Sequence, residues 1–358
     1  MYRPGLGRTP NYVAQSAQLT EARSSSWLGE GSQTVQQQAL RDLDQAYRNW
    51  WSNPGHFRRP TWRQRGVHEG FRIVGQQATR WERLSKNRAR VRVPKVGWVD
   101  WRWSRDPGDP KSYRVSQDRA GRWWISFAVI PPSIGGPSND SVVGVDRGVT
   151  HSFVTSDGAM IDTPRLTTGE RSRLLRLQRK LARQQKGSNR REATKRQIAR
   201  IKHREVNQRK DTIEKLTTDL ARTHDNIVLE DLNIGAMTAS TKGAVSRPGV
   251  NVAAKSGLNR EILSSGWGLF QRRLKDKIGD QRLVLVPAAY TSQRCNACGH
   301  TSPENRKSQA VFKCRSCGHS ANADVNAAQN IRDLAAGCAV TARGAPSVGA
   351  VKREPSAA

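Results

Sequence analysis

Long apolar runs are missing from this 358-residue chain. No stretch of eighteen or more apolar residues occurs, so no segment of the sequence predicts a membrane-spanning helix. Residues 1–5 also lack the apolar core with which a secretory signal peptide begins. We therefore expect a protein of the cytoplasm that works in aqueous surroundings.

Acidic residues are scarce relative to basic ones. The chain has 61 Lys and Arg against 30 Asp and Glu, a formal net charge of +31. Self-repulsion of this size opposes folding unless a polyanion neutralises it, so the composition indicates a polyanionic partner. Nucleic acid is the first candidate, because basic side chains that neutralise phosphates release counterions. An anionic membrane surface is the weaker alternative.

Cysteine is also rare, and its placement fits a metal site in a reducing cytosol better than a disulfide framework. Four of the five cysteines form two Cys-x-x-Cys-Gly motifs with fifteen residues between Cys298 and Cys314, and Cys338 alone lies elsewhere. Each motif can present two thiolates to one ion, which is the arrangement of a tetrahedral zinc site. Four thiolates leave no open coordination position, so the predicted zinc is structural. The predicted ligands are Cys295, Cys298, Cys314 and Cys317.

The composition and periodicity of the N-terminal third of the sequence change near residue 56. Residues 1–32 have scattered hydrophobics and are expected to be poorly ordered, whereas residues 34–51 have the periodicity of a helix. Residues 56–130 hold seven of the eleven tryptophans, interleaved with arginine, and alternate as strands do over 96–103 and 123–129. These tryptophans could form the core of a small β-rich module or serve as stacking platforms for nucleic acid.

After a Pro- and Gly-rich linker at residues 131–138 the sequence predicts an α/β order. Three strands come first, then helices that alternate with strands, which is the element order of an RNase H-like domain. The expected strands are 141–145, 151–155, a short one after the Asp157-Gly158 turn, 227–229 and 283–286. The expected helices are 168–224 with a break at 187–189, 259–278, and one that begins at Asp324; residues from 337 onward are expected to fray.

The long helical region is unusually basic. Residues 171–215 contain 17 Lys and Arg but only 4 Asp and Glu. A charge run is usually a solvated helix face, but this imbalance is larger than solubility requires. We expect this region to contact a nucleic-acid backbone.

Acidic side chains stand at three points where predicted elements begin or end. Asp146 follows the strand 141–145, Glu230 and Asp231 follow the strand 227–229, and Asp324 begins the last helix. Each acid alone is explained by a turn or a helix cap. Together they predict a site for Mg²⁺ or Mn²⁺, since clustered carboxylates need cations between them and oxygen ligands suit these ions. Strand alternation places Glu230 and Asp231 on opposite faces without showing which one faces the site.

Four blocks of this sequence resemble the signature blocks of TnpB, also called OrfB, the transposon-encoded family of RNA-guided nucleases that is related to type V CRISPR effectors. The blocks are Gly144-Val145-Asp146-Arg147-Gly148, Leu229-Glu230-Asp231-Leu232, residues 292–299, and Asp324 to Ile331. The resemblance implies that Asp146, Glu230 and Asp324 are catalytic acids and magnesium ligands. It also implies that the four cysteines of the two motifs bind zinc. It assigns no role to Arg147.

The resemblance implies an α+β, multidomain fold. A β-rich, barrel-like wedge domain with a helical insert would precede an RNase H-like (RuvC) α/β domain that contains a zinc ribbon. The expected domains are 1–55, a partly disordered start with a helical recognition remnant; 56–136, the wedge-type domain; 137–289, the first part of the RuvC-like domain; 290–320, the zinc ribbon; 321–336, the last part of the RuvC-like domain; and 337–358, a disordered tail. Relative to the family, the N-terminus is expected to be shortened.

The function implied is that of an RNA-guided DNA endonuclease that cleaves phosphodiester bonds by two-metal-ion hydrolysis. Its expected cofactors are structural Zn²⁺ and catalytic Mg²⁺, the latter as two ions. Its expected partners are a guide RNA encoded near the transposon end and double-stranded DNA with a short flanking motif. It would act in a prokaryotic cytoplasm, on the nucleoid. Two alternatives remain open, an RNA-guided repressor that binds without cleaving and a guide-independent RuvC-like nuclease or transposase.

Overall fold

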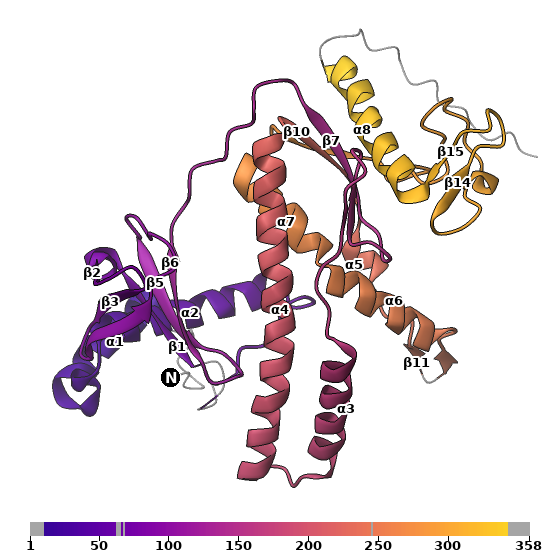
Figure 1. The fold of residues 1–358 in the computed structure, drawn as a ribbon. Helices are drawn as coiled ribbons and strands as arrows, with labels where there is room; N and C mark the ends of the chain where they lie inside the picture. The colour runs from indigo at the N-terminus through magenta and orange to yellow at the C-terminus, as the bar shows by residue number, and fades with distance from the viewer. Residues whose placement is uncertain (1–10, 62–65, 67–68, 245, 343–358) are drawn as a thin grey trace, which may run out of the picture. The chain divides into compact units, whose positions relative to one another are not determined.

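The computed structural model describes the chain except residues 1–10, 62–65, 67–68, 245 and 343–358 (Figure 1). The chain divides into two compact units, one of residues 1–130 with 173–201 and one of residues 131–172 with 202–358. Both helices and sheets are present, which agrees with the predicted α+β class. No helix in the described part is both long and apolar enough to cross a membrane.

The first unit begins with two helices, α1 (Tyr12–Ser25) and α2 (Gln33–Ser52). Helix α2 was predicted within one residue at each end, but the prediction that residues 1–32 are poorly ordered is wrong for α1. Hydrophobic periodicity could not indicate α1, because polar contacts hold it: the Asn11 side chain caps its start, and Arg23 donates a 2.8 Å hydrogen bond to the Leu28 carbonyl oxygen. Residues 1–10 lie outside the described part.

The tryptophan-rich segment of the first unit forms six strands in two antiparallel sheets, β1-β5-β6 and β2-β3-β4. A small core that includes Ile73, Val91 and Tyr113 lies between these strands. The strands are β1 (Gly70–Val74), β2 (Trp81–Arg83), β3 (Arg88–Val93), β4 (Gly97–Arg102), β5 (Ser112–Gln117) and β6 (Trp123–Ala128). The predicted β-rich module is therefore present.

The predicted break in the basic helical region is also present. Helix α3 (Thr168–Arg183) and helix α4 (Asn189–Thr223) are separated by a short turn that contains Gly187 at φ 83°. The guanidinium of Arg191 donates 2.9 Å to the carbonyl oxygen of Gln184 and also contacts the Leu181 carbonyl oxygen. Arg191 thus caps the C-terminal end of α3.

The second unit is built on a five-stranded sheet in the order β13-β10-β7-β8-β9. Strand β7 pairs in parallel with β10, and β10 in parallel with β13, whereas β8 and β9 are antiparallel additions. The strands are β7 (Val142–Asp146), β8 (Phe153–Thr155), β9 (Met160–Ile161), β10 (Asn226–Glu230) and β13 (Leu283–Val286). Buried β-branched runs predicted the three parallel strands within a residue or two at each end.

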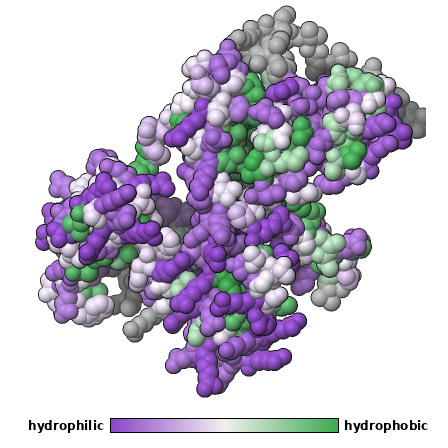
Figure 2. All heavy atoms as spheres, in the orientation of Figure 1, coloured by the Kyte–Doolittle hydropathy of each residue, from purple (hydrophilic) through white to green (hydrophobic). Residues whose placement is uncertain are grey.

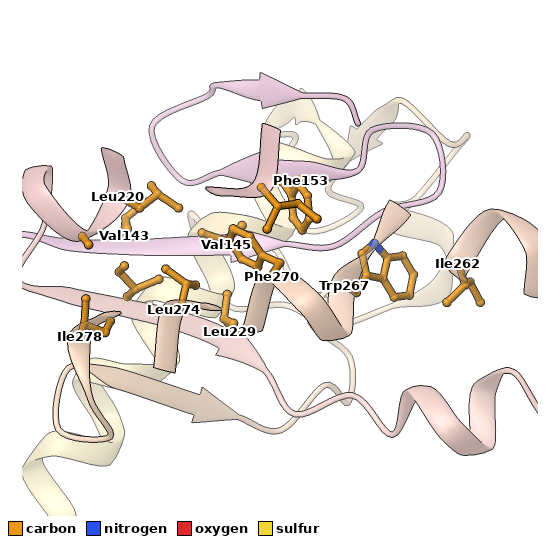
Figure 3. Packing of buried hydrophobic residues seen from close by; sticks show 13 residues of the cluster. Val143, Val145, Phe153, Leu220, Leu229, Ile262, Trp267, Phe270, Leu274 and Ile278 are labelled. Atoms are coloured by element: carbon orange, nitrogen blue, oxygen red, sulfur yellow. The ribbon is translucent and has the colours of Figure 1, made fainter. Parts of the chain in front are cut away.

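Strand alternation gives β7 and β10 two buried faces. Val143, Val145 and Leu229 point to one face and pack with side chains of α4 and α7 (Figure 3). Val142 and Val228 point to the other face, which packs against α8 (Ala323–Ala342). Helices therefore cover both faces of the sheet, as expected for strands without a polar side.

The predicted helix over residues 259–278 is in fact two helices, α6 (Val252–Ser265) and α7 (Trp267–Ile278). They meet at Gly266, whose φ of 78° lies in the left-handed region, and a Cβ there would lie 2.7 Å from the Ile213 Cδ1 atom. Three short elements precede α6, namely α5 (Ile234–Met237), β11 (Gly243–Ala244) and β12 (Arg247–Pro248).

The last helix also differs from the prediction. We expected fraying from residue 337, but α8 continues to Ala342. The remaining tail residues, 343–358, lie outside the described part.

Candidate active site and metal centre

Asp146 and Glu230 end two neighbouring parallel strands. The last paired residues of β7 and β10 are Val145 and Leu229, so the two acids follow at the same edge of the sheet. Both acids belong to the even-numbered face of their strands, the face that α8 covers. The structure therefore brings these two predicted residues together.

Helix α8 carries the third acid to this edge. A Cβ on Gly144 would lie 2.1 Å from the carbonyl oxygen of Ala328, so the backbones of β7 and α8 approach as closely as glycine permits. One helical turn before Ala328 stands Asp324, whose side chain is buried. The close approach places Asp324 beside the carboxyl end of β7, where it acts electrostatically on Asp146.

Asp324 is not the residue that caps α8. The side-chain oxygen of Asn322 accepts hydrogen bonds from the backbone nitrogens of Asp324 and Val325, at 3.0 and 3.2 Å. The Asp324 carboxylate instead accepts a 2.9 Å hydrogen bond from the guanidinium of Arg306. The structural explanation considered for this acid, that it caps the helix, does not hold.

The three carboxylates repel one another. Burial, then the charges of Glu230 and Asp324, raise the pKa of Asp146 to about 7. Burial also raises the pKa of Glu230, although its Oε1 accepts a 2.5 Å hydrogen bond from the Thr291 hydroxyl. This is the electrostatic condition in which a cation bound between the acids is stabilising.

Asp231 lies on the opposite side of its strand and is exposed. Its backbone nitrogen donates a 2.8 Å hydrogen bond to the Val286 carbonyl oxygen, which continues the pairing of β10 with β13. Strand alternation alone left Glu230 and Asp231 equivalent. Packing of α8 on the even-numbered face distinguishes them.

The donor set of this edge fits a hard divalent cation. Asp146, Glu230 and Asp324 offer carboxylate oxygens, which suit Mg²⁺ or Mn²⁺ and do not favour softer metals. Among the described residues, the one group of three or more possible metal ligands whose ligand atoms all lie within 4.8 Å of one another is the cysteine group. The role of the three acids as metal ligands stays a prediction.

The four predicted cysteines come together. The Sγ atoms of Cys295 and Cys317 are 3.7 Å apart, and those of Cys298 and Cys314 are 3.6 Å apart. Four sulfurs about 2.3 Å from a central zinc lie roughly 3.8 Å from each other, so the spacing fits a tetrahedral site. Backbone N–H groups, first that of Cys317, lower the pKa of Cys314 to about 6, which favours the thiolate that zinc requires.

Two asparagines attach the cysteine motifs to α8. Asn326 donates 2.8 Å to the Arg294 carbonyl oxygen, and its own side-chain oxygen accepts from the Asn296 backbone nitrogen. Asn330 donates to the carbonyl oxygens of Arg294 and Thr291, at 2.7 and 2.9 Å. The short strands β14 (Val311–Lys313) and β15 (Ser320–Asn322) complete this segment and lead directly into α8. The fold of the cysteine segment thus bears on the position of Asp324.

Sequence reasoning missed Arg147, Arg306, Thr291 and the two asparagines. Each acts through partners that lie between 18 and 124 residues away along the chain. Arg147, Asn326 and Asn330 lie inside the motif blocks and Thr291 lies beside one, but membership of a block does not show where a side chain points. Arg306 lies outside the blocks.

Basic side chains gather on the α3–α4 hairpin. Figure 2 shows hydrophilic residues over much of this hairpin. A cavity of about 390 Å³ on α3 is lined by Gln184 and four basic side chains: Arg176, Arg179, Lys180 and Arg183. No acidic residue lines it, so this surface suits an anion.

The tryptophans of the β-rich module divide into two groups. Trp81 and Trp101 each contact the ring of Trp103, and all three side chains are half-buried. Trp98 and Trp124 are 46% and 42% exposed, and each lies beneath an arginine guanidinium. Both predicted roles thus have residues that suit them, a core and an exposed surface with stacking capacity.

Comparison with protein families gives two matches. Residues 130–241 match the OrfB_IS605 family, described as "Probable transposase". Residues 267–331 match the family described as "Cas12f1-like, TNB domain". The first match contains Asp146 and Glu230, and the second contains the four cysteines and Asp324.

Individual relatives match over most of their length. The chain is 39% identical over 343 residues to an Escherichia coli (strain K12) protein named "Putative RNA-guided DNA endonuclease InsQ", covering 94% of this chain and 82% of that protein. It is 30% identical to the Streptomyces pristinaespiralis "Putative RNA-guided DNA endonuclease", covering 95% and 81%. Among solved structures, a Cas12f1-sgRNA-target DNA complex matches with a TM-score of 0.46 and 15% identity, over 84% of this chain and 71% of that one.

Proposed function

The chain belongs to the TnpB (OrfB) family of RNA-guided DNA endonucleases, and we propose that it cleaves DNA at sites chosen by a bound guide RNA. The observation that carries this proposal is the meeting of Asp146, Glu230 and Asp324 at one edge of a sheet, in a chain that covers 82% of a relative named as an RNA-guided DNA endonuclease. Clustered acids can bind the metal ions that phosphodiester hydrolysis requires, whereas a module that only binds nucleic acid has no need of them.

The proposed catalytic domain is RuvC-like and holds two Mg²⁺ ions. Asp146 and Glu230 would bind them from the strand ends, and Asp324 from the first turn of α8. When bound, such ions supply a water activated for attack on phosphorus and a stabilised leaving oxygen. The protein's part is to keep three mutually repelling carboxylates in place, which the sheet, the α8 packing at Gly144 and the Thr291 hydrogen bond support.

We propose a structural role for zinc at the four cysteines. Buried Cys295 and Cys314, with exposed Cys298 and Cys317, would enclose the ion completely. Because the two asparagines of α8 bind the backbone of this segment, zinc would stabilise the start of the helix that carries Asp324.

The proposed domain boundaries are those expected from the sequence. Residues 137–289 and 321–336 would form the RuvC-like domain, with the zinc ribbon at 290–320 inserted between them. Residues 56–136 would form a wedge domain, barrel-like in the family. Residues 1–55 would contribute a helical recognition element.

Guide RNA and target DNA are the proposed partners. The basic surface of α3, with no acid lining its cavity, supports contact with a phosphate backbone. The exposed tryptophan–arginine pairs of the β-rich module support a second contact, through stacking. Base pairing with the guide would select the target, and the protein would read a short flanking motif. We propose that the guide is encoded near the transposon end and that the enzyme acts in the prokaryotic cytoplasm, on the nucleoid.

The bound RNA provides the test that separates this function from its alternatives. The protein is purified from its native host and the associated RNA is sequenced, with a non-specific basic protein of the same host as control. We expect one dominant RNA species, with a constant part and a terminal guide segment whose sequence differs between copies. A guide-independent nuclease or transposase would carry no such species. A repressor would carry it yet leave a matched plasmid uncut in Mg²⁺.

A further inference from the structure

Arg147 directly follows the first of the three acids, and its side chain is buried, with 4% of its surface exposed. Its guanidinium reaches two other elements. One terminal nitrogen donates a 3.0 Å hydrogen bond to the Gln271 side-chain oxygen on α7, and the other donates to the carbonyl oxygen of Glu230 at the end of β10. The Nε atom has no hydrogen-bond partner in the described part of the chain. Arg147 therefore joins β7, β10 and α7 at one point.

A buried guanidinium needs compensation. Arginine stays charged, and taking a cation out of water costs several kcal/mol unless charges and hydrogen bonds offset the loss. Here the offsetting charges are Glu230, Asp146 and Asp231. The charged guanidinium of Arg147 thus lies beside the acids of the site. A neutral or apolar residue would be buried there at a lower desolvation cost.

The location of the hydrogen bonds explains what the side chain can do. The backbone pairing of β7 with β10 ends at Val145 and Leu229, one residue before the two acids. Beyond that pair, the Arg147 guanidinium connects the end of β10 back to the residue that follows β7. The carboxylates of Asp146 and Glu230 point to the α8 side, and Arg147 reaches Gln271 on the α7 side.

We propose that Arg147 is a positioning residue of the acidic site, which fixes the Glu230 backbone relative to Asp146 from behind the sheet and holds the carboxylates close by its charge. This inference rests on the proposed function, because it assumes that the acids bind divalent cations. Arg147 would touch neither the metal nor the DNA. Its contribution would be to the affinity of the site for its ions.

The test uses Arg147→Lys, which keeps the charge but loses the planar fork that serves two acceptors at once. Mn²⁺ binding is measured by the loss of the free-ion EPR signal on the full-length, guide-loaded protein. The Asp146→Ala complex gives the background of Mn²⁺ bound by the RNA. Cleavage is then measured on the same samples as a function of Mg²⁺ concentration.

Arg282→Lys is the matched control. Arg282 also donates to backbone carbonyl oxygens, those of Asp225, Ala221 and His224, but it holds the start of β10. Glu230 lies at the other end of that five-residue strand, about 13 Å away at roughly 3.3 Å per residue. Both variants lose a hydrogen-bonding arginine, and only one loses it beside the acids.

We expect Arg147→Lys to weaken site-specific Mn²⁺ binding by about ten-fold or more, the usual effect of removing a group that orients metal ligands. The Mg²⁺ concentration for half-maximal cleavage should rise in parallel, and guided DNA binding should stay within about two-fold of wild type. Arg282→Lys should lower the melting temperature. It should leave the Mn²⁺ affinity and the Mg²⁺ concentration for half-maximal cleavage unchanged.

Two results would overturn the inference. Wild-type Mn²⁺ affinity in Arg147→Lys would show that the residue does not position the site, and an equal loss in Arg282→Lys would show a general effect of stability. Both leave the proposed function standing. If wild-type protein itself binds no Mn²⁺ above the Asp146→Ala background and cleaves nothing, the proposed function fails and this inference fails with it.

Discussion

The backbone of Gly144 touches the backbone of Ala328: a Cβ on the glycine would lie 2.1 Å from the alanine carbonyl oxygen and 2.5 Å from the Arg332 amide nitrogen. This contact sets how closely α8 approaches β7, and so how closely Asp324 approaches Asp146. A single methyl group at Gly144 would therefore separate two acids without altering either.

Gly144→Ala should lower both stability and activity. Overpacking of a core commonly costs about 1–3 kcal/mol, and contact with rigid backbone places this case at the upper end. Cleavage should fall below detection even at temperatures where circular dichroism shows a folded protein. Gly257→Ala in α6 is the control, since a Cβ there meets nothing within 4 Å. An active Gly144→Ala enzyme would show that the spacing of α8 and β7 does not matter.

The sheet of the second unit could be predicted from sequence, because strands buried on both faces consist of consecutive apolar, mostly β-branched residues. Residues 142–145, 227–229 and 283–286 are such runs, and the ends of the first two carry acids. The cysteine group was equally predictable, since two Cys-x-x-Cys-Gly motifs at this spacing are typical of a zinc site. In both cases the information is local.

What could not be predicted depends on contacts between distant residues. Arg147 binds the Glu230 carbonyl oxygen 83 positions away, and no pattern along the chain directs it there. The break at Gly266 depends on the Ile213 side chain, which fills the space where a Cβ would stand. Helix α1 depends on side-chain caps in place of an apolar face. Hydrophobic periodicity carries none of these signals.

Zinc removal should act on the acidic site through α8. We expect one zinc ion per chain by elemental analysis, bound with an apparent free energy on the order of 10 kcal/mol. Cys298→Ser should reduce soluble yield and cleavage together, because the cysteine segment leads into the helix of Asp324. Cys338→Ser, the remaining cysteine of the sequence, should change neither. Active protein without zinc would refute the structural role.

The raised pKa of Asp146 should make the stability of the metal-free protein depend on pH. Asp146 has a pKa of about 7 in the folded chain, against about 3.9 in an unfolded one. Between these values the folded protein retains a proton that the unfolded chain has released, so this group's contribution to stability is lost as pH rises through about 7. Wild-type protein without Mg²⁺ should therefore lose melting temperature relative to Asp146→Asn as the pH rises from about 4 to about 7, and the difference should stay constant above that.

Added Mg²⁺ should close this gap above about pH 7, because the cation replaces the proton as the compensating charge. Thermal melts of both proteins over this range, with and without Mg²⁺, make the comparison. Parallel curves for wild type and Asp146→Asn would mean that the Asp146 carboxyl is not perturbed by its surroundings.

RNA binding should depend steeply on salt through the α3 surface. Arg176→Glu with Arg179→Glu removes two exposed cations from the cavity on this helix. For every phosphate that the protein no longer neutralises, the log–log salt slope should fall by roughly 0.7 to 0.9. Arg191 is unsuitable for such a test, because it closes the end of α3.

Lys275→Glu with Lys313→Glu gives the same change in net charge at exposed positions outside the hairpin. Filter binding over a salt series should show a flatter slope for the α3 pair than for this control. If both pairs lower the slope equally, the hairpin acts only through net charge, and the specific RNA-binding surface must lie elsewhere, with the β-rich module as the next region to test.

Guided cleavage by the purified protein is the measurement that tests the central claim most directly. The protein with its RNA is incubated in Mg²⁺ with a plasmid that carries the sequence matching the guide, and with a plasmid in which that sequence is scrambled. We expect cleavage of the matched plasmid alone, its loss in Asp146→Ala, Glu230→Ala and Asp324→Ala with DNA binding retained, and its persistence in Asp231→Ala. Cleavage of both plasmids, or undiminished cleavage in any of the three alanine variants, would contradict the account.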